Sequence, residues 1–299
     1  MSGARAIDLA IGEMRQGEAV LADAVAAYQQ ALGSRLAAGY ALGSLAHGGF
    51  SPLVSDVDLG LILRDPLRGS DRLAVGRVAD AVRAGGSVLH ERLSVFWGTP
   101  STLAGQVRGG RFPPLDRLDL LEHGRLLTGR DARQRVARPG QAELLVAGAE
   151  FALGFLAGAE AGADRGQDSA QGPLHNDNAL DEIRTPTRLV SGGPRRLTKI
   201  VLFPVRFLFT AATGQVATNT LAAEYYLASA NAPAAELVTA AQAWRLRPPT
   251  DPGAAAALVA RELIPLYLHY IDDHIPRLAA LGHDSLADRF RRWRARLLA

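Results

Sequence analysis

The chain has 299 residues, with 33 Lys and Arg against 30 Asp and Glu, and it contains no cysteine. The lack of cysteine excludes disulfides, thiolate metal sites and cysteine nucleophiles. A net charge of +3 is too small to predict a nucleic-acid partner without a localised basic patch. The early acids Asp8 and Glu13 argue against a secretory signal, and the most apolar run is broken by Pro204 and Arg206. We therefore expect a cytoplasmic protein that does not enter a membrane.

Strand-like and helical segments alternate in the first half of the chain. Apolar residues at helical spacing predict helices over residues 5–33 and 67–84. Short runs rich in apolar, β-branched or aromatic residues predict strands over 36–42, 57–63 and 88–97. This alternation indicates an α/β (α+β) domain with a short mixed sheet.

After residue 138 the strand-like runs disappear and alanine-rich helical segments take over. The predicted helices cover residues 141–163, 195–212, 218–230, 233–246, 254–272 and 275–298. We therefore expect residues 1–138 to form the α/β domain and residues 139–299 to form an all-α helical bundle. Between the first two helices, residues 164–193 are rich in Gly, Asp, Asn, Ser and Pro, which predicts a long surface loop.

The sharpest chemical signal lies in the predicted strand–turn–strand unit of the first domain. Gly43-Ser44 follows the first predicted strand, and Asp56 and Asp58 flank the start of the second. Alternation along a strand puts the two carboxylates on one face, about 6–7 Å apart. Hard cations such as Mg²⁺ neutralise such a pair, and a glycine turn that opens a helix can bind phosphate. The alternative is that Asp56 only caps the turn after Ser55.

The run LGSLAHGGFSPLVSDVDLGLIL, which begins at Leu42, resembles a known signature. It is similar to the hG[GS] and D-x-D-h motif of the nucleotidyltransferase fold, in the DNA polymerase β-like superfamily. Residues 118–131 are similar to the end of that domain in aminoglycoside and minimal nucleotidyltransferases. The resemblance covers residues 35–131, and the helical half follows it only in outline.

The resemblance implies an enzyme that transfers a nucleoside monophosphate from an NTP, expected to be ATP, to a hydroxyl of a small-molecule acceptor. Pyrophosphate would leave. Asp56 and Asp58 would be catalytic and would ligate a pair of Mg²⁺ ions, while Gly43 and Ser44 would bind the triphosphate. The implied partners are thus a nucleotide and a small molecule.

Two further site residues are less clear-cut. The family usually has a third carboxylate on the next strand, for which Glu91 is our candidate, although Ser94 occupies an equally suitable position. If Glu91 only pairs with Arg92, a nucleotide-binding relative without catalysis stays open. A protein- or tRNA-directed transferase is a separate alternative, which a wide and shallow cleft would favour. Lys199 shares a helical face with Arg206 and is a candidate triphosphate contact.

Other polar residues have simpler interpretations. His47 either contacts phosphate or is a solvated loop histidine, and Asp119 with its neighbouring acids is interpreted as a solvated helix face or local caps. His269 and Asp273 have the i, i+4 spacing of metal ligands, but a solvated helix face explains them more simply.

Overall fold

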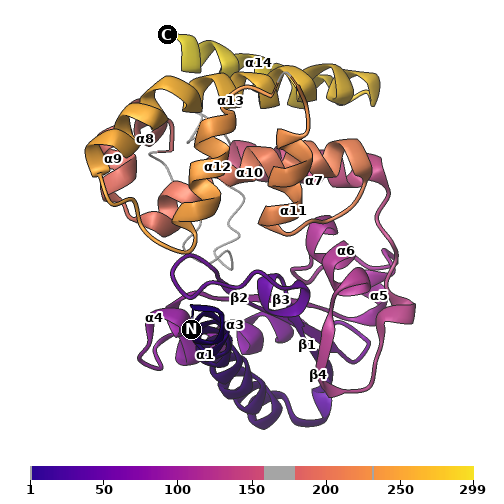
Figure 1. Cartoon of the computed structure of the whole chain (residues 1–299). Coiled ribbons are helices and arrows are strands. Elements are labelled where there is room, and N and C mark those ends of the chain that lie inside the picture. Colours follow the sequence, from indigo (N-terminus) through magenta and orange to yellow (C-terminus); the bar gives the residue numbers. More distant parts are fainter. Residues whose placement is uncertain (1, 158–178, 231) are drawn as a thin grey trace. The chain divides into compact units, whose positions relative to one another are not determined.

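The computed structural model describes residues 2–157, 179–230 and 232–299. The chain forms two compact units, Met1–Pro139 and Gly140–Ala299, so it divides one residue beyond the boundary expected from the sequence. The first unit combines helices with a sheet, and the described part of the second unit is helical (Figure 1). This architecture confirms the predicted fold class, an α/β domain followed by a helical one.

Four strands form one mixed sheet in the order β3-β2-β1-β4. Their bounds are β1 (Leu36–Leu42), β2 (Val57–Leu63), β3 (Leu93–Gly98) and β4 (Arg125–Gly129). β1 runs antiparallel to both β2 and β4, whereas β2 and β3 are parallel. The two central strands cover the ranges that the sequence predicted, because both are apolar apart from Asp58 and are largely buried under the helices.

Helices cover both faces of the sheet. They are α1 (Ser2–Leu32), α2 (Ser44–His47), α3 (Asp71–Arg83), α4 (Val88–Glu91), α5 (Pro100–Leu103) and α6 (Pro114–Glu122). On one face, Leu59 and Leu61 of β2 pack in a core with residues of α1 and α3. On the other face, Ile62 packs with Leu103 of α5 and Leu120 of α6. Because side chains alternate along a strand, Asp58 of β2 faces the same side as Ile62, toward α5 and α6.

The predicted strand over 88–97 is partly wrong. Its first residues form the helical turn α4, and β3 begins only at Leu93. The physical reason is a cap, because the Ser87 side chain accepts a hydrogen bond from the backbone N–H of His90. Residues 118–127 contain the end of α6 and the start of β4.

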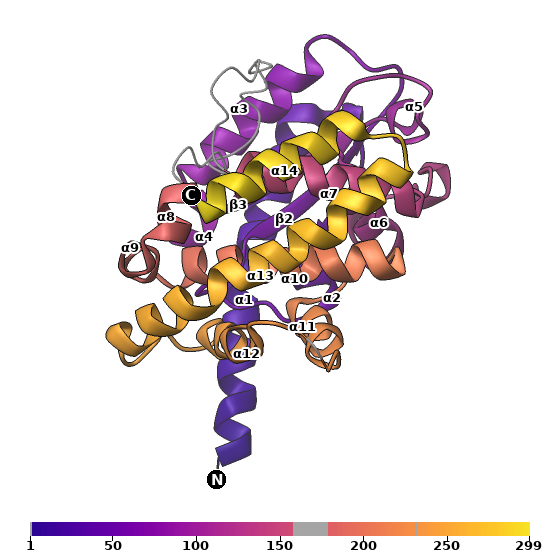
Figure 2. The same ribbon diagram turned by 90° about the horizontal axis from the view of Figure 1, so that it is seen from above.

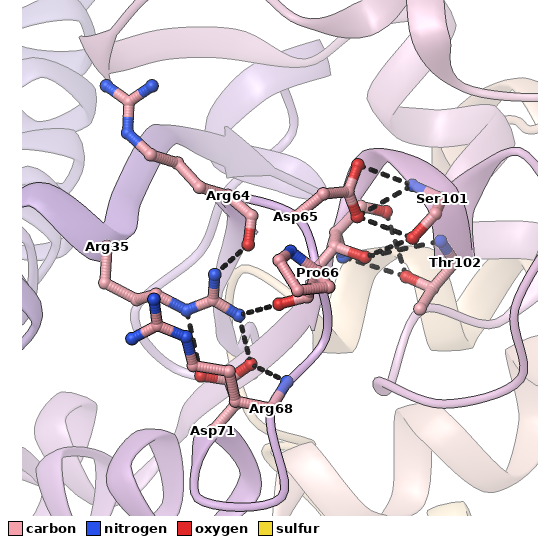
Figure 3. A network of polar contacts seen from close by, with 9 residues as sticks. Arg35, Arg64, Asp65, Pro66, Arg68, Asp71, Ser101 and Thr102 are labelled. Carbon is pink, nitrogen blue, oxygen red and sulfur yellow. Dashed lines mark hydrogen bonds and ion pairs between the residues drawn. The ribbon is translucent and has the colours of Figure 1, made fainter.

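A polar network joins the start of α3 to the residue that precedes β1 and to the residues that follow β2 (Figure 3). Asp71 is 3% exposed. Its carboxylate accepts two hydrogen bonds from the Arg35 guanidinium, of which the one from Nε is 3.0 Å long. It accepts a third hydrogen bond from the backbone N–H of Arg68, at 2.8 Å. The guanidinium of Arg35 also donates to the carbonyls of Arg64 and Pro66. The network thus fixes the chain after β2 against the chain before β1.

Replacing Asp71 with alanine is expected to lower the free energy of unfolding by about 3–5 kcal/mol, because Arg35 keeps a buried charge without its partner. Asp80→Ala is the matched control. Its carboxylate is 77% exposed and lies 3.1 Å from Arg83, so its loss should cost less than about 1 kcal/mol. Urea melts at pH 7 measure both changes, and equal losses in the two variants would contradict the assignment.

The Asp71 contribution should also depend on pH. Burial raises the pKa of Asp71, but the hydrogen bonds from Arg35 and from the Arg68 N–H outweigh burial and bring the pKa below its usual value. The stabilisation is therefore complete above the unfolded-state pKa of about 3.9 and is lost as the pH falls through the lower folded-state pKa. In urea melts, the gap between wild type and Asp71→Ala should shrink in acid and stay constant above about pH 5.

The described part of the second unit consists of one helix before residue 158 in the sequence and seven helices after residue 178. They are α7 (Gln141–Phe155), α8 (Ala179–Arg184), α9 (Pro186–Ser191), α10 (Pro194–Thr213), α11 (Asn219–Leu227), α12 (Ala235–Trp244), α13 (Pro252–Ala280) and α14 (Asp284–Leu298). α13 and α14 lie side by side (Figures 1 and 2). Their shared core contains the edge-to-face pair Tyr267 and Trp293, both 0% exposed, with ring centroids 5.6 Å apart. The Tyr267 hydroxyl donates to the Ile200 carbonyl at 2.8 Å, which attaches α10.

Two sequence expectations for this unit need correction. Residues 164–178 of the predicted loop lie outside the described residues, but most of residues 179–193 form α8 and α9, held by the buried side chains of Ile183 and Leu189. The predicted helix break at 272–275 is absent, and α13 runs on through Pro276 because buried apolar residues on both sides keep it packed.

α13 is also the one helix, among the described residues, with the length and mean hydropathy of a membrane span. A helix in the core of a protein can have the same length and mean hydropathy. Tyr270 and Ile271 of α13 are 0% exposed within this unit, which is the behaviour of a core helix.

Candidate functional site

The turn between β1 and α2 is built on Gly43. Its φ of 59° and ψ of −147° lie in a region that glycine adopts far more readily than other residues. A Cβ atom at this position would lie 2.3 Å from Oδ2 of Asp58. The Asp58 carboxylate therefore packs directly against the turn, so the structure brings together the two parts of the sequence motif.

The two aspartates sit where β2 begins. Asp58 pairs with Leu42 of β1 and with Ser94 of β3, and Asp56 lies two residues earlier, just before the strand. Both acids are half-buried, whereas Val57 between them is 0% exposed in the core on the opposite face. The carboxylates are thus held at the edge of the core, on the side of the sheet where Gly43 turns.

The donor set of this site suits a hard cation. Within residues 2–157, 179–230 and 232–299, no three His, Asp or Glu side chains converge as a ready-made metal site. Mg²⁺ does not need one, since proteins commonly hold it through one or two carboxylates while phosphates and water fill the other positions. Asp56 and Asp58 therefore fit a Mg²⁺ ion that arrives with a nucleotide.

Glu91, the expected third carboxylate, does not lie on the sheet. Glu91 is exposed at the end of α4, ahead of β3, so the prediction that it lies on a strand is wrong. Ser94 is the residue in register with Asp58, and strand alternation puts both on one face. A hydroxyl thus stands where an acid was expected.

The backbone N–H of Gly43 donates to Oδ2 of Asp119 at 2.6 Å. Binding of the triphosphate at Gly43 and Ser44 stays a prediction, and this N–H is already used within the fold. α2 begins at Ser44, and the N–H groups of Ser44 and Leu45 precede that of Ala46, which is the first to donate within the helix. These two N–H groups and the Ser44 hydroxyl are what the turn offers to an anion.

Asp119 is the residue of this site that the sequence interpretation missed. It is 6% exposed on α6, not part of a solvated face. Its neighbours Leu118 and Leu120 are both 0% exposed, and a single acid inside the run LDLL was a signal for a buried polar role. His47 is likewise no solvated loop residue, because its side chain is 10% exposed and its Nε2 lies 3.8 Å from Oδ1 of Asp119.

The remaining candidates belong to the second unit. Lys199 is half-buried on α10, and its contact with nucleotide stays a prediction. Asp273, which the sequence paired with His269, lies 3.2 Å from His274 and 2.9 Å from Arg277. Burial raises the pKa of Asp273, but hydrogen bonds from those two side chains outweigh it and bring the pKa to about 2. Asp273 therefore takes part in ion pairs, and no metal group forms with His269 among the described residues.

The chain matches no protein-family model and no curated protein sequence. Its fold is similar to the crystal structure of spectinomycin adenyltransferase AAD(9) from Enterococcus faecialis with ATP and spectinomycin. The TM-score is 0.51 at 11% sequence identity, and the match covers 82% of this chain and 98% of that one. This likeness confirms the predicted nucleotidyltransferase fold. At that identity it is a likeness of fold alone.

Proposed function

We propose that this chain is a Mg²⁺-dependent nucleotidyltransferase that transfers a nucleoside monophosphate from an NTP, with ATP as the expected donor, to a hydroxyl of a small molecule. The observation that carries the proposal is the close packing of the Asp58 carboxylate against the Gly43 turn. This packing puts a carboxylate suited to a hard cation beside the start of α2, on a fold similar to that of an adenyltransferase solved with ATP and a small molecule.

The reaction rests on alignment and charge compensation. The acceptor oxygen attacks the α-phosphorus, a new O–P bond forms, the bond to the β-phosphate breaks, and pyrophosphate and a proton are released. When bound, Mg²⁺ offsets the negative charge of the phosphoryl oxygens. Asp56 and Asp58 would hold the ion, and the Ser44 hydroxyl with the first N–H groups of α2 would orient the triphosphate. Lys199 is proposed as an additional contact to the triphosphate.

ATP binding is expected to depend on both Mg²⁺ and Asp56. Calorimetry should show that wild type binds ATP at least about tenfold more tightly with Mg²⁺ than with EDTA, because the ion joins the carboxylates to the phosphates. Asp56→Asn should lose most of this difference, since a neutral amide is a weaker ligand for a hard cation.

Asp80→Asn is the control for this titration, because it makes the same substitution at an exposed carboxylate on α3. It should bind ATP as wild type does, with the same response to Mg²⁺. ATP binding that ignores both the metal and the Asp56 substitution would contradict the proposed function.

A nucleotide-binding protein without catalysis is the second candidate. It is favoured by one observation, namely that Ser94 is the residue in register with Asp58 while Glu91 is exposed on α4. Pyrophosphate release with ATP, Mg²⁺ and a panel of hydroxyl-bearing acceptors, beginning with spectinomycin, separates the two functions. Release that requires an acceptor supports transfer, and Mg²⁺-dependent ATP binding without release across the panel supports the second candidate.

A further inference from the structure

Asp119 is a buried acid whose two oxygens have unequal surroundings. Oδ2 accepts the N–H of Gly43 at 2.6 Å. Oδ1 is buried and has no hydrogen-bond partner among the described residues. An uncompensated carboxylate oxygen destabilises a fold, and an apolar side chain would pack as well between Leu118 and Leu120. Packing alone therefore does not account for an acid at this position.

The group closest to this second oxygen is the His47 ring. Its Nδ1 lies 3.2 Å from the Gly48 carbonyl oxygen, which can only accept, so Nδ1 carries a hydrogen. Nε2 lies 3.8 Å from Oδ1 of Asp119, and this contact is attractive when Nε2 carries a hydrogen as well. The His47 ring thus lies directly beside the second oxygen of Asp119.

Asp119 thereby contacts both ends of α2. Gly43 directly precedes this helix and His47 is its last residue. A helix of four residues has little stability of its own, and its backbone bonds here run from the N–H groups of Ala46 and His47 to the Gly43 carbonyl, at 2.9 and 3.0 Å. The position of Ser44, the first residue of α2, consequently depends on the contacts that hold Gly43 in place.

We infer that Asp119 is a positioning residue for the nucleotide, which fixes the Gly43 turn and α2 so that Ser44 meets the triphosphate in one orientation. The inference rests on the proposed function. Asp119 acts through the backbone of the turn and not by touching phosphate, because two negative groups repel each other. Its loss is therefore expected to weaken ATP binding while leaving the chemical step nearly unchanged.

Three substitutions test this role by KM for ATP and kcat for pyrophosphate release. Asp119→Asn keeps an acceptor oxygen for the Gly43 N–H, whereas Asp119→Ala removes it and Asp119→Glu displaces it by one methylene. KM should rise at least about tenfold for the alanine and glutamate variants and stay within about threefold of wild type for asparagine. kcat should change less than about threefold in all of them. Asp80→Asn serves as the control, with unchanged constants.

A purely structural role would lower the melting temperature and leave KM of the folded protein unchanged. The inference would be overturned if the alanine and glutamate variants had the KM of wild type. It would also be overturned if KM rose as much in the asparagine variant as in the alanine variant. If Asp119→Ala does not fold, the comparison of KM for ATP between Asp119→Asn and Asp119→Glu decides. A role that needed only the negative charge would give the glutamate variant the lower KM. Wild-type protein that binds no ATP would overturn the proposed function and this role with it. If wild type releases pyrophosphate and the Asp119 variants do so with unchanged constants, the inference is overturned and the proposed function is not.

Discussion

Asp58→Asn is expected to lower the rate of nucleotidyl transfer by at least about 10²-fold, comparable to the removal of a preorganised charge-stabilising group. The amide has nearly the shape of the carboxylate, so it can keep its packing against Gly43 and its place in β2 beside Ser94. What it loses is the negative charge that would hold Mg²⁺. Pyrophosphate release under saturating ATP and Mg²⁺ measures the loss.

The fold of this variant should be intact, because the amide nearly keeps the shape of the half-buried carboxylate, and its melting temperature should stay close to that of wild type. Asp80→Asn, on the opposite face of the sheet, should retain full activity. Asp58→Asn with wild-type turnover would show that this carboxylate does not serve the reaction. A large drop in melting temperature would instead assign it a structural role.

Gly43→Ala is expected to disrupt both the turn and the site. The backbone conformation at φ 59° and ψ −147° costs alanine about 1–3 kcal/mol. The new methyl group would lie 2.3 Å from Oδ2 of Asp58, so the carboxylate must move. Because a displacement of about 1 Å can cost about 10²-fold in rate, we expect near-complete loss of pyrophosphate release together with a lower melting temperature.

Gly48→Ala separates the effect of backbone strain from the effect of the contact with Asp58. Gly48 also has a positive φ, 92°, but a Cβ atom there would have nothing within 4 Å. The control should therefore show backbone strain in a thermal melt and keep most of its activity. If the two alanine variants lost activity equally, strain in the turn would be the cause and the contact with Asp58 would be irrelevant.

Much of the fold follows from local sequence. Residues 36–42 and 57–63 are apolar apart from Asp58 and are bounded by glycine and by proline-containing turns, and both are strands as predicted. The change to alanine-rich helical spacing after Pro139 marks the second unit in the same way. Such signals succeed because periodic burial in one element is encoded within that element.

Interpretation failed where a short segment depends on a cap or on distant partners. Residues 88–91 have strand-like composition, yet Ser87 caps a helical turn there. Residues 179–191 have the composition of a loop, yet the burial of Ile183 and Leu189 makes helices of them. A local cap decides the first place and tertiary burial decides the second, and each outweighs the preference of the residues themselves.

The sequence by itself determined the glycine turn and the acid pair, because Gly43, Asp56 and Asp58 lie close along the chain and the strand period fixes their face. Only the tertiary structure decided which residues join them. Strand register puts Ser94 beside Asp58, and the packing of α6 brings Asp119 to Gly43 from 76 residues away. Register and helix packing depend on contacts between distant segments, which no local pattern records.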